Sequence, residues 1–347
     1  RNTDKKKVEQ MNYTIKDIAR RANVSIATVS RVINKTGSVA QKTEKRILAI
    51  TRELNYVPNN VARSLVKQSS KTIGVIVADI MNPFYAEIIR AIQDQADEDG
   101  YSVISCNSDE DMGKEKQCIH MLLENQVNGI IFAGGRGKGD YYNQQVVDVA
   151  KIVPVVLADE ALEGDNIYSI ICNKSKGAYE AVHYLIELGH RNIAMINGYQ
   201  EYKPSIEKLK GYKKALKEAG IPYCDKYIKN SDYHLDGGMN HVKELMNLED
   251  PPSAIFAAND LMAMGAIKAL KDLGYKVPKD ISVIGFDDIA MNEYTMPALS
   301  SVRQEMTLQG HMAVQILHKL FSNEENPKKK YTIEPSLIKR DSCQVKQ

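Results

Sequence analysis

The sequence predicts an α/β protein with an N-terminal all-α helix-turn-helix head and hinge helix, followed by two doubly wound parallel-sheet lobes. Three observations lead to this prediction. Residues 14–34 hold two short helical patterns that meet at Asn23. From Thr72 onward, short apolar runs alternate with longer stretches of helical pattern, as in parallel sheets covered on both faces. The charge is also divided: residues 11–70 hold eleven Lys and Arg against three acids, whereas residues 71–347 hold 31 basic and 39 acidic side chains.

The first helix is predicted to begin after Thr14 and to run to about Ala22. Thr14 and Asp17 have the spacing of a capping box, in which each side chain bonds the backbone amide of the other residue. Asn23 tolerates the left-handed turn conformation, and Ser25 can cap the second helix. That second helix is expected to turn one set of side chains to the core, Val29, Val32 and Ile33, and another set to solvent, Ile26, Ala27, Ser30 and Arg31.

Two amphipathic helices joined by an Asn turn also occur in many all-α domains that do not bind DNA. The division of charge favours DNA, because a basic head neutralises phosphates while an acidic body is kept off the duplex. We therefore expect double-stranded DNA to be a partner of the head.

A third amphipathic helix is expected at residues 41–55, with an inner side made of Ile47, Leu48, Ile50 and Leu54. Pro58 stops this helix. Residues 59–65 provide one or two turns of helix-forming sequence before a polar segment at 67–71, so we expect a hinge that folds only against another surface. Residues 1–10 lack apolar periodicity and are expected to be a disordered or cloning-derived tail before a natural start at Met11.

The strands of the two lobes are predicted from seven apolar runs: Ile73–Ala78, Val103–Cys106, Gly129–Ala133, Val155–Ala158, Ile193–Ile196, Ala254–Ala257 and Val283–Phe286. An extended piece at Asn166–Asn173 lies midway between two sets of strand-helix units. Seven or more strand-helix units are more than one open sheet comfortably holds. Two lobes are therefore expected, with a cleft where the carboxyl ends of their strands converge.

Several kinds of site are not expected. No apolar run approaches the roughly eighteen residues that span a bilayer, and the N-terminus is not signal-like, which predicts a soluble cytoplasmic protein. The five cysteines form no Cys-x-x-Cys pair and are expected to be reduced. The glycine-rich run Gly134–Gly139 fails both phosphate-loop patterns, because Gly139 follows Lys138 and Asp140 stands where a glycine is needed. No metal, cofactor or catalytic residue is predicted, and the chain is not expected to be an enzyme.

Four separated motifs resemble the LacI/GalR family of bacterial transcription regulators: Val24–Asn34, Tyr56–Asn59 leading to Ala62–Leu65, Leu188–Ala194 and Asp280–Asp288. The resemblance covers Asn12 to about Arg340. It implies lobes of the periplasmic-binding-protein type that the chain crosses three times. The implied divisions are a DNA-binding domain at 11–58, a hinge helix and linker at 59–71, an N-terminal lobe at 72–170 plus 303–332, and a C-terminal lobe at 171–302 plus 333–347.

The same resemblance implies the residues that contact operator DNA. Arg31 stands where the family reads bases in the major groove; it can pair with a guanine edge or a phosphate, and the alternative is a solvated surface cation. Leu65 stands where family members insert an apolar wedge into the minor groove, and the alternative is packing within a small helix. The full implied DNA-binding set is Thr14, Ser25, Ile26, Ala27, Thr28, Ser30, Arg31, Asn34, Tyr56, Asn59, Ala62 and Leu65.

An effector-binding set is implied for the cleft: Phe84, Tyr85, Asp159, Lys208, Tyr233, Asn259 and Asp287. Aromatic rings can stack on a small ligand while carboxylate and amide groups fix its hydroxyls, so a sugar or related metabolite is expected. The alternatives are that Asn259 caps the following helix and that Phe84 and Tyr85 pack within one. Sugar-responsive relatives usually carry Arg where Lys208 stands, and Lys is a point charge rather than a planar fork.

The predicted function is that of a transcriptional regulator, above all a repressor, which binds a pseudo-palindromic operator as a homodimer and responds to the cleft effector. The runner-up is a catabolite-control-type regulator that answers to a phosphorylated carrier protein, although Thr307 and Gln315 stand where such regulators carry Tyr and Arg. A sugar-processing α/β enzyme and a periplasmic sugar-binding protein are further alternatives. The basic head argues against the enzyme, and the lack of a signal peptide argues against the periplasmic protein.

Overall fold

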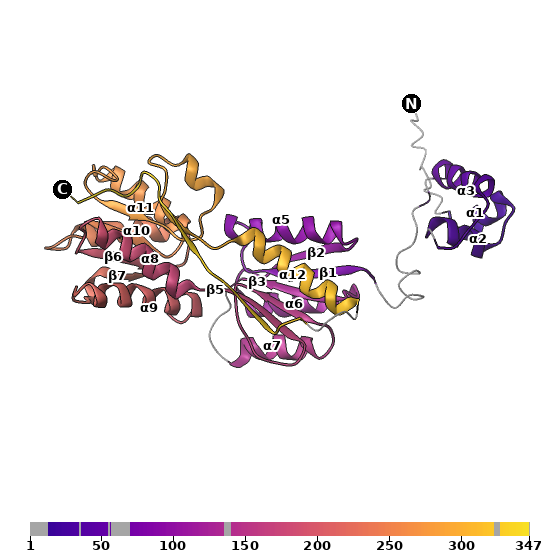
Figure 1. Ribbon diagram of the computed structural model, residues 1–347, viewed down its shortest axis with the longest axis horizontal. Helices are drawn as coiled ribbons and strands as arrows, with labels where there is room; N and C mark the ends of the chain where they lie inside the picture. Colours follow the sequence, from indigo (N-terminus) through magenta and orange to yellow (C-terminus); the bar gives the residue numbers. More distant parts are fainter. Residues whose placement is uncertain are drawn as a thin grey trace, which may run out of the picture. The chain divides into compact units, whose positions relative to one another are not determined.

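The computed structural model describes residues 13–34, 36–54, 56, 70–134, 140–322 and 327–346. The chain divides into two compact units, Arg1–Ser70 and Lys71–Gln347. The first unit is a helical head, drawn in indigo in Figure 1, and the second is an α/β core. None of the helices that the structure describes combines the length and hydropathy needed to cross a membrane.

The head consists of α1 (Ile15–Ala22), α2 (Ile26–Ile33) and α3 (Gln41–Glu53). The predicted caps are confirmed. The amide and the hydroxyl of Thr14 donate to the Asp17 carboxylate at 2.9 and 2.7 Å. Asn23 ends α1 in the left-handed region, with φ of 47°, and Ser25 Oγ accepts from the Thr28 amide at 3.1 Å to begin α2. The turn between the two helices is therefore fixed by local hydrogen bonds.

The core of the head forms where the three helices meet. Its fully buried side chains include Ile18, Val29 and Ile47. The prediction that Leu48 faces inward is wrong, because its side chain is 36% exposed. Leu48 follows Ile47 by one residue and so lies about 100° around the helix from it, beyond the buried stripe. The helix also ends at Glu53 rather than at residue 55.

The N-terminal lobe is built on a six-stranded parallel sheet in the order β11-β5-β4-β3-β1-β2. Its strands are β1 (Thr72–Val77), β2 (Ser102–Asn107), β3 (Gly129–Ala133), β4 (Val155–Ala158), β5 (Ile167–Cys172) and β11 (Lys330–Ile333). Its helices are α5 (Pro83–Glu98), α6 (Met112–Glu124), α7 (Asp140–Ala150) and α12 (Met306–Phe321).

Alternation along β1 shows how both faces of this sheet are covered. Val75 and Val77 pack in the cluster that includes buried side chains of α5 and α12, whereas Ile76 packs with those of α6 and α7. Figure 1 shows the two pairs of helices on opposite sides of the sheet. A strand buried on both faces reads as a continuous apolar run, which is why the sequence predicted it.

The C-terminal lobe repeats this design on a four-stranded parallel sheet in the order β7-β6-β8-β9. Its strands are β6 (Ile193–Asn197), β7 (Ile228–Asn230), β8 (Ala254–Ala257) and β9 (Ser282–Ile284). Its helices are α8 (Lys174–Glu187), α9 (Lys203–Glu218), α10 (Leu235–Met246) and α11 (Asp260–Asp272), with short 3₁₀ turns η1 (Asp225–Tyr227) and η2 (Ala290–Tyr294). All seven predicted apolar runs are strands of the two parallel sheets.

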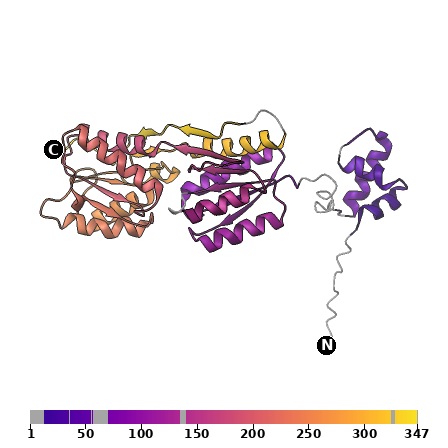
Figure 2. The ribbon, with the colours of Figure 1, turned by 90° about the horizontal axis from the view of Figure 1, so that it is seen from below.

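The chain passes between the lobes at three places: from β5 to α8, from β10 (Ser301–Arg303) to α12, and from β11 to β12 (Ser336–Ile338). The strands β10 and β12 pair with each other in an antiparallel ribbon. Figure 2 shows the yellow C-terminal segment running from one lobe to the other. Three segments of chain therefore connect the two lobes beside the cleft.

Candidate functional sites on the head and between the lobes

The outward face of α2 is presented as the sequence predicted. Ile26 is 44% exposed, Ala27 and Arg31 are exposed, and Ser30 is half-buried. The hydroxyls of Ser25 and Thr28 lie 2.9 Å apart at the start of the helix. An exposed helix face with apolar, hydroxyl and guanidinium groups can contact base edges and phosphates in a major groove.

Other members of the predicted DNA set are partly engaged within the head. Thr14 is exposed but bonds Asp17, and Asn34 Nδ2 donates to Ser30 Oγ at 3.0 Å. Tyr56 packs half-buried against the core of the head. Asn59, Ala62 and Leu65 lie outside the described residues.

The basic side chains of the head differ in their partners. Arg20 lies 3.5 Å from Asp17, and Arg21 lies 3.1 Å from Glu53. Within the described residues Arg31 has no acidic side chain at ion-pair distance. Its guanidinium is therefore available to an external anion or to a base.

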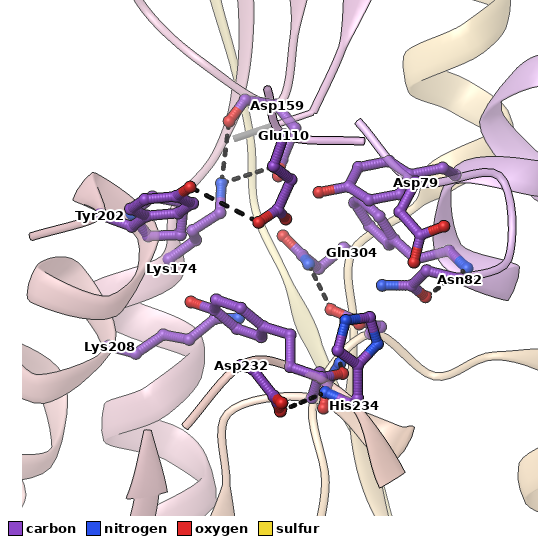
Figure 3. A pocket seen from close by; sticks show the side chains of 16 residues that line it. Asp79, Asn82, Glu110, Asp159, Lys174, Tyr202, Lys208, Asp232, His234 and Gln304 are labelled. Carbon is purple, nitrogen blue, oxygen red and sulfur yellow. Dashed lines mark hydrogen bonds and ion pairs between the residues drawn. The ribbon is translucent and has the colours of Figure 1, made fainter. Parts of the chain in front are cut away.

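A polar cleft lies where strands of both lobes end. All seven residues of the predicted effector set line it, namely Phe84, Tyr85, Asp159, Lys208, Tyr233, Asn259 and Asp287. Nine further lining residues were not predicted: Asp79, Asn82, Glu110, Lys174, Tyr202, Pro204, Asp232, His234 and Gln304. Figure 3 shows these side chains converging from both lobes on one space. The cavity volume is about 50 Å³, room for a few water molecules.

Lys174 and Asp159 form a buried ion pair at one wall. Lys174 Nζ lies 2.5 Å from a carboxylate oxygen of Asp159 and 3.1 Å from its carbonyl oxygen. Burial opposes the charge on Lys174, but Asp159, Cys172 and Asp287 together outweigh it, and the pKa of Lys174 is raised. Lys174 therefore stays charged, and it holds Asp159 in place beside the first crossing.

Lys208, on the neighbouring helix α9 of the same lobe, has different partners. Its ammonium donates to the Ala258 carbonyl at 2.6 Å and lies 4.1 Å from the centroid of the Phe286 ring. Burial lowers the pKa of Lys208, against the opposing charge of Asp287. Each contact uses part of the ammonium's capacity, so a ligand acceptor can still bond it.

Tyr233, Asn259 and Asp287 are oriented by neighbours in the cleft wall. The Tyr233 hydroxyl lies 2.6 Å from Ser205 Oγ, and Asn259 Nδ2 donates to the Tyr233 carbonyl at 2.8 Å. Asn259 also caps α11, since its Oδ1 accepts from the Met262 amide at 2.9 Å. The alternative that Asn259 caps the following helix is therefore confirmed. The same side chain also lines the cleft.

Backbone strain is concentrated in this lining. Asp159, Tyr233 and Asp287 have φ values of 75°, 66° and 113°. Non-glycine residues rarely adopt such values, which cost about 1–3 kcal/mol each and are frequent at binding sites. The fold thus holds these three side chains in orientations that an ordinary strand or helix would not give.

Acidic side chains from both lobes also line the cleft. Asp79 and Glu110 follow the first two strands of the N-terminal lobe, and Asp232 and His234 follow β7 of the other lobe. Burial raises the pKa of Glu110, opposed by His234 and reinforced by Asp79 and Asp232. Polar residues directly after strands in a doubly wound sheet mark a binding edge, so this signal was present in the sequence.

The cleft provides hydrogen-bond acceptors, two ammonium groups and aromatic faces in a small concave space, which suits the binding of a polar molecule. No group of three His, Cys, Asp or Glu side chains with the spacing of a metal site occurs in the described part of the chain. The five cysteines are unpaired with one another.

Comparison with known proteins agrees with both sites. Residues 14–59 match the model for bacterial regulatory proteins of the lacI family, and residues 182–343 match that for a periplasmic binding protein-like domain. The chain is 41% identical to catabolite control protein A of Priestia megaterium, over 90% of this chain and 94% of that protein. It is 35% identical to the transcriptional repressor PurR of Photobacterium profundum, over 95% of this chain and 98% of that protein.

Solved structures give the same result. The lac repressor dimer bound to operator and an anti-inducer superposes with a TM-score of 0.84 at 30% identity, covering 96% of this chain and 99% of that one. The regulator CelR in complex with cellobiose superposes with a TM-score of 0.72 at 28% identity, covering 95% and 99%. The relatives and structural neighbours with stated activities are transcriptional regulators. The chain therefore belongs to the lacI family of bacterial DNA-binding transcriptional regulators.

Proposed function

We propose that this chain is a repressor that binds a pseudo-palindromic operator as a homodimer and is switched by a small polar ligand in the cleft between its lobes. The observation that supports this best is the cleft itself, in which side chains of both lobes share one space beside three crossings. In this proposal residues 11–58 bind DNA and 59–71 form the hinge. In place of the expected divisions at 170, 302 and 332, the lobes are taken to divide after β5, after β10 and after β11, so that these strands stay whole.

The size of the cleft supports a switch. Ligand sites for small molecules usually enclose about 300–1,000 Å³, whereas this cavity holds about 50 Å³. We therefore expect a sugar-sized ligand to part the lobes or to move lining side chains. A ligand that binds one lobe arrangement more tightly shifts the population toward it, and with it the spacing of paired heads.

A sugar or related metabolite fits the lining. The neighbour CelR is described with cellobiose, and a regulator of Enterococcus faecium, 26% identical with a TM-score of 0.70, with bound ribose. In this chain Phe84 and Tyr85 offer aromatic surfaces, while Asp159, Asn259 and Asp287 offer oxygen and amide groups.

The homodimer follows from the geometry of DNA, because a pseudo-palindrome presents two half-sites that need two heads. The second unit also exposes large apolar side chains close together in sequence. Tyr294 is 86% exposed and Met296 is 94% exposed. Such side chains are typical of surfaces that contact another chain. Sedimentation at micromolar concentration should show a dimer, and a monomer alone would contradict this part of the proposal.

Selection of random duplexes by the purified full chain, followed by sequencing of the bound DNA, tests the proposal. We expect one enriched pseudo-palindromic site whose affinity falls steeply with salt, because several Lys and Arg replace counterions on the phosphates. Failure to enrich any sequence, or an affinity independent of salt, would contradict DNA regulation by the head.

A catabolite-control mode with a phosphorylated carrier protein is the second candidate, favoured by the 41% identity to catabolite control protein A. Thr307 and Gln315, which stand where such regulators carry Tyr and Arg, have partners within the N-terminal lobe. Thr307 Oγ1 donates to Glu87 at 3.1 Å, and Gln315 donates to Gln95 at 3.4 Å. Operator affinity measured with and without the phosphorylated carrier protein decides this mode. An increase on addition would support it.

A further inference from the structure

More acidic than basic side chains line the cleft. Five carboxylates line it, Asp79, Glu110, Asp159, Asp232 and Asp287, against the ammonium groups of Lys174 and Lys208 and the imidazole of His234. Lys174 is bonded to Asp159, and Lys208 to the Ala258 carbonyl. Asp79, Glu110 and Asp232 have no Lys or Arg at ion-pair distance in the part of the chain that the structure describes. No lysine or arginine therefore balances these three acidic groups within the described residues, and His234 is the basic group that acts on Glu110.

A buried acceptor in the same cleft also lacks a donor. Gln304 is only 2% exposed, and its Nε2 donates to Asp287 at 2.7 Å. That bond fixes the orientation of the amide, because a carboxylate needs the nitrogen to face it. Its Oε1 is buried without a hydrogen-bond partner. In Figure 3 Gln304 lies in the middle of the space, between Glu110 and His234. A buried oxygen left unbonded is costly, so a ligand that donates here gains affinity.

The spacing of these acidic side chains limits which kind of cation could bind among them. No three of the described His, Cys, Asp and Glu side chains lie close enough together to hold a metal ion. The carboxylates come from both lobes and surround a space rather than a point, as Figure 3 shows. An organic cation with several hydrogen-bond donors fits this arrangement, whereas a phosphate group would face uncompensated carboxylates.

We propose that the ligand of the cleft is a polyhydroxy compound with a protonated amine, such as an amino sugar or amino alcohol. Its ammonium lies among Asp79, Glu110 and Asp232, and a hydroxyl or ammonium hydrogen donates to Gln304 Oε1. The inference rests on the proposed function, because it assigns the chemical class of the effector. It gains support from Glu110, whose pKa is raised by burial and by Asp79 and Asp232, and which an ammonium would stabilise as a carboxylate.

Calorimetric titration of the full chain with matched ligands tests this. One set is D-glucosamine, D-glucose and N-acetyl-D-glucosamine; a second is the galactose series; a third is 1-amino-1-deoxysorbitol with sorbitol. D-glucose 6-phosphate is the anionic probe. We expect an amine-bearing member to bind about tenfold or more tightly than its hydroxyl and N-acetyl counterparts, because charge-assisted hydrogen bonds are the strong ones.

Two variants locate the ammonium. Asp232→Asn and Glu110→Gln keep the shape of each side chain and remove its charge, so each should erase most of the preference for the amine. Binding of the hydroxyl counterpart should change little. Asp272→Asn is the matched control, because Asp272 lies on α11 of the same lobe as Asp232 and pairs with Lys268 at the surface. Thermal unfolding of each variant shows that it is folded.

A neutral or phosphorylated sugar that binds as tightly as the amine would overturn the inference, and so would the absence of binding by every amine tested. If variants fail to fold, the ligand series on the parent chain alone decides. The proposed function is judged separately, by operator binding. A neutral ligand that alters operator affinity would retain the regulator and reject the amine, whereas a chain that selects no operator would reject the regulator itself.

Discussion

The side-chain amide of Gln304 donates a 2.7 Å hydrogen bond to the carboxylate of Asp287. Gln304 lies directly after β10, where the chain passes to α12 of the other lobe, and Asp287 lies in the loop that follows β9. The bond thus joins the second crossing to the wall of the cleft. A ligand that bonds Asp287 competes with Gln304 or recruits it, which links occupation of the cleft to the hinge.

Replacement of Asp287 should therefore affect the ligand and spare the DNA. Asp287→Ala is expected to weaken effector binding about tenfold or more, because a buried hydrogen-bonding carboxyl group is lost, one whose pKa burial raises well above its usual range. Operator binding by the ligand-free protein should be unchanged. Titrations of effector and of operator measure the two effects, and Asp272→Ala serves as the surface control. An Asp287→Ala protein with normal effector affinity would remove Asp287 from the site.

Arg31 gives a separate test on the head. Arg31→Ala should cost roughly 1–3 kcal/mol of operator binding and blur discrimination at one base pair if the guanidinium reads a base. If it contacts only a phosphate, all duplexes should weaken alike. Arg90→Ala is the control, because Arg90 is an exposed arginine of the second unit that pairs with Asp94. Unchanged affinity for every duplex would place Arg31 outside the interface.

Leu65 tests the implied hinge. Leu65→Ala should lower operator affinity, since opening a base step costs a few kcal/mol that is recovered only when an apolar group fills the gap. Effector affinity should stay nearly intact. A gel-shift series with the parent and variant proteins measures the first quantity, and calorimetry the second. If the variant bound operator as the parent does, the wedge assignment would be wrong.

His190 predicts how stability depends on pH. Its ring nitrogens lie 2.9 Å from Ser253 Oγ and 3.0 Å from Ser282 Oγ, and Nε2 lies 3.2 Å from the Gln344 carbonyl, so it ties the C-terminal segment to the sheet of the second lobe. Burial lowers the pKa of His190, although the bond to Gln344 opposes this. The unfolded chain, with a His pKa of about 6.5, then binds more protons than the folded one as pH falls.

The contribution of His190 to the free energy of unfolding should therefore be greatest above about pH 6.5 and be lost as the pH is lowered through that value. His190→Asn should be less stable at pH 7.5 but lose less stability between pH 7.5 and 5.5 than the parent does. Urea titrations at the two pH values measure this. His183→Asn is the exposed control, and an equal loss in the parent and His190→Asn would contradict the role of His190.

The buried strands could be predicted because they are apolar on both faces. Gly129–Ala133, Val155–Ala158 and Ala254–Ala257 have the predicted bounds. The short strands β7 and β11 escaped prediction, since Ile228–Asn230 and Lys330–Ile333 carry polar residues and no continuous apolar run. Their pairing depends on neighbours that lie far away in the sequence.

The residues of the cleft likewise include some that the sequence could predict and some that it could not. Asp79 and Glu110 follow apolar strands and could have been chosen from the sequence by the rule that ligands bind beyond the carboxyl ends of strands. Lys174 and Gln304 could not, because each lies at a crossing whose path only the folded lobes define. Leu48 was placed wrongly because helical periodicity alone does not fix the width of the buried stripe.

Operator affinity of the full chain, measured with and without a cleft ligand in the parent, Asp287→Ala and Leu65→Ala proteins, tests the account most directly. We predict that ligand changes the operator affinity of the parent. Asp287→Ala should bind operator normally but fail to respond, while Leu65→Ala should bind ligand normally but hold operator weakly. A parent whose operator affinity is the same at saturating ligand, or two variants with the same defect, would contradict a cleft that controls the head.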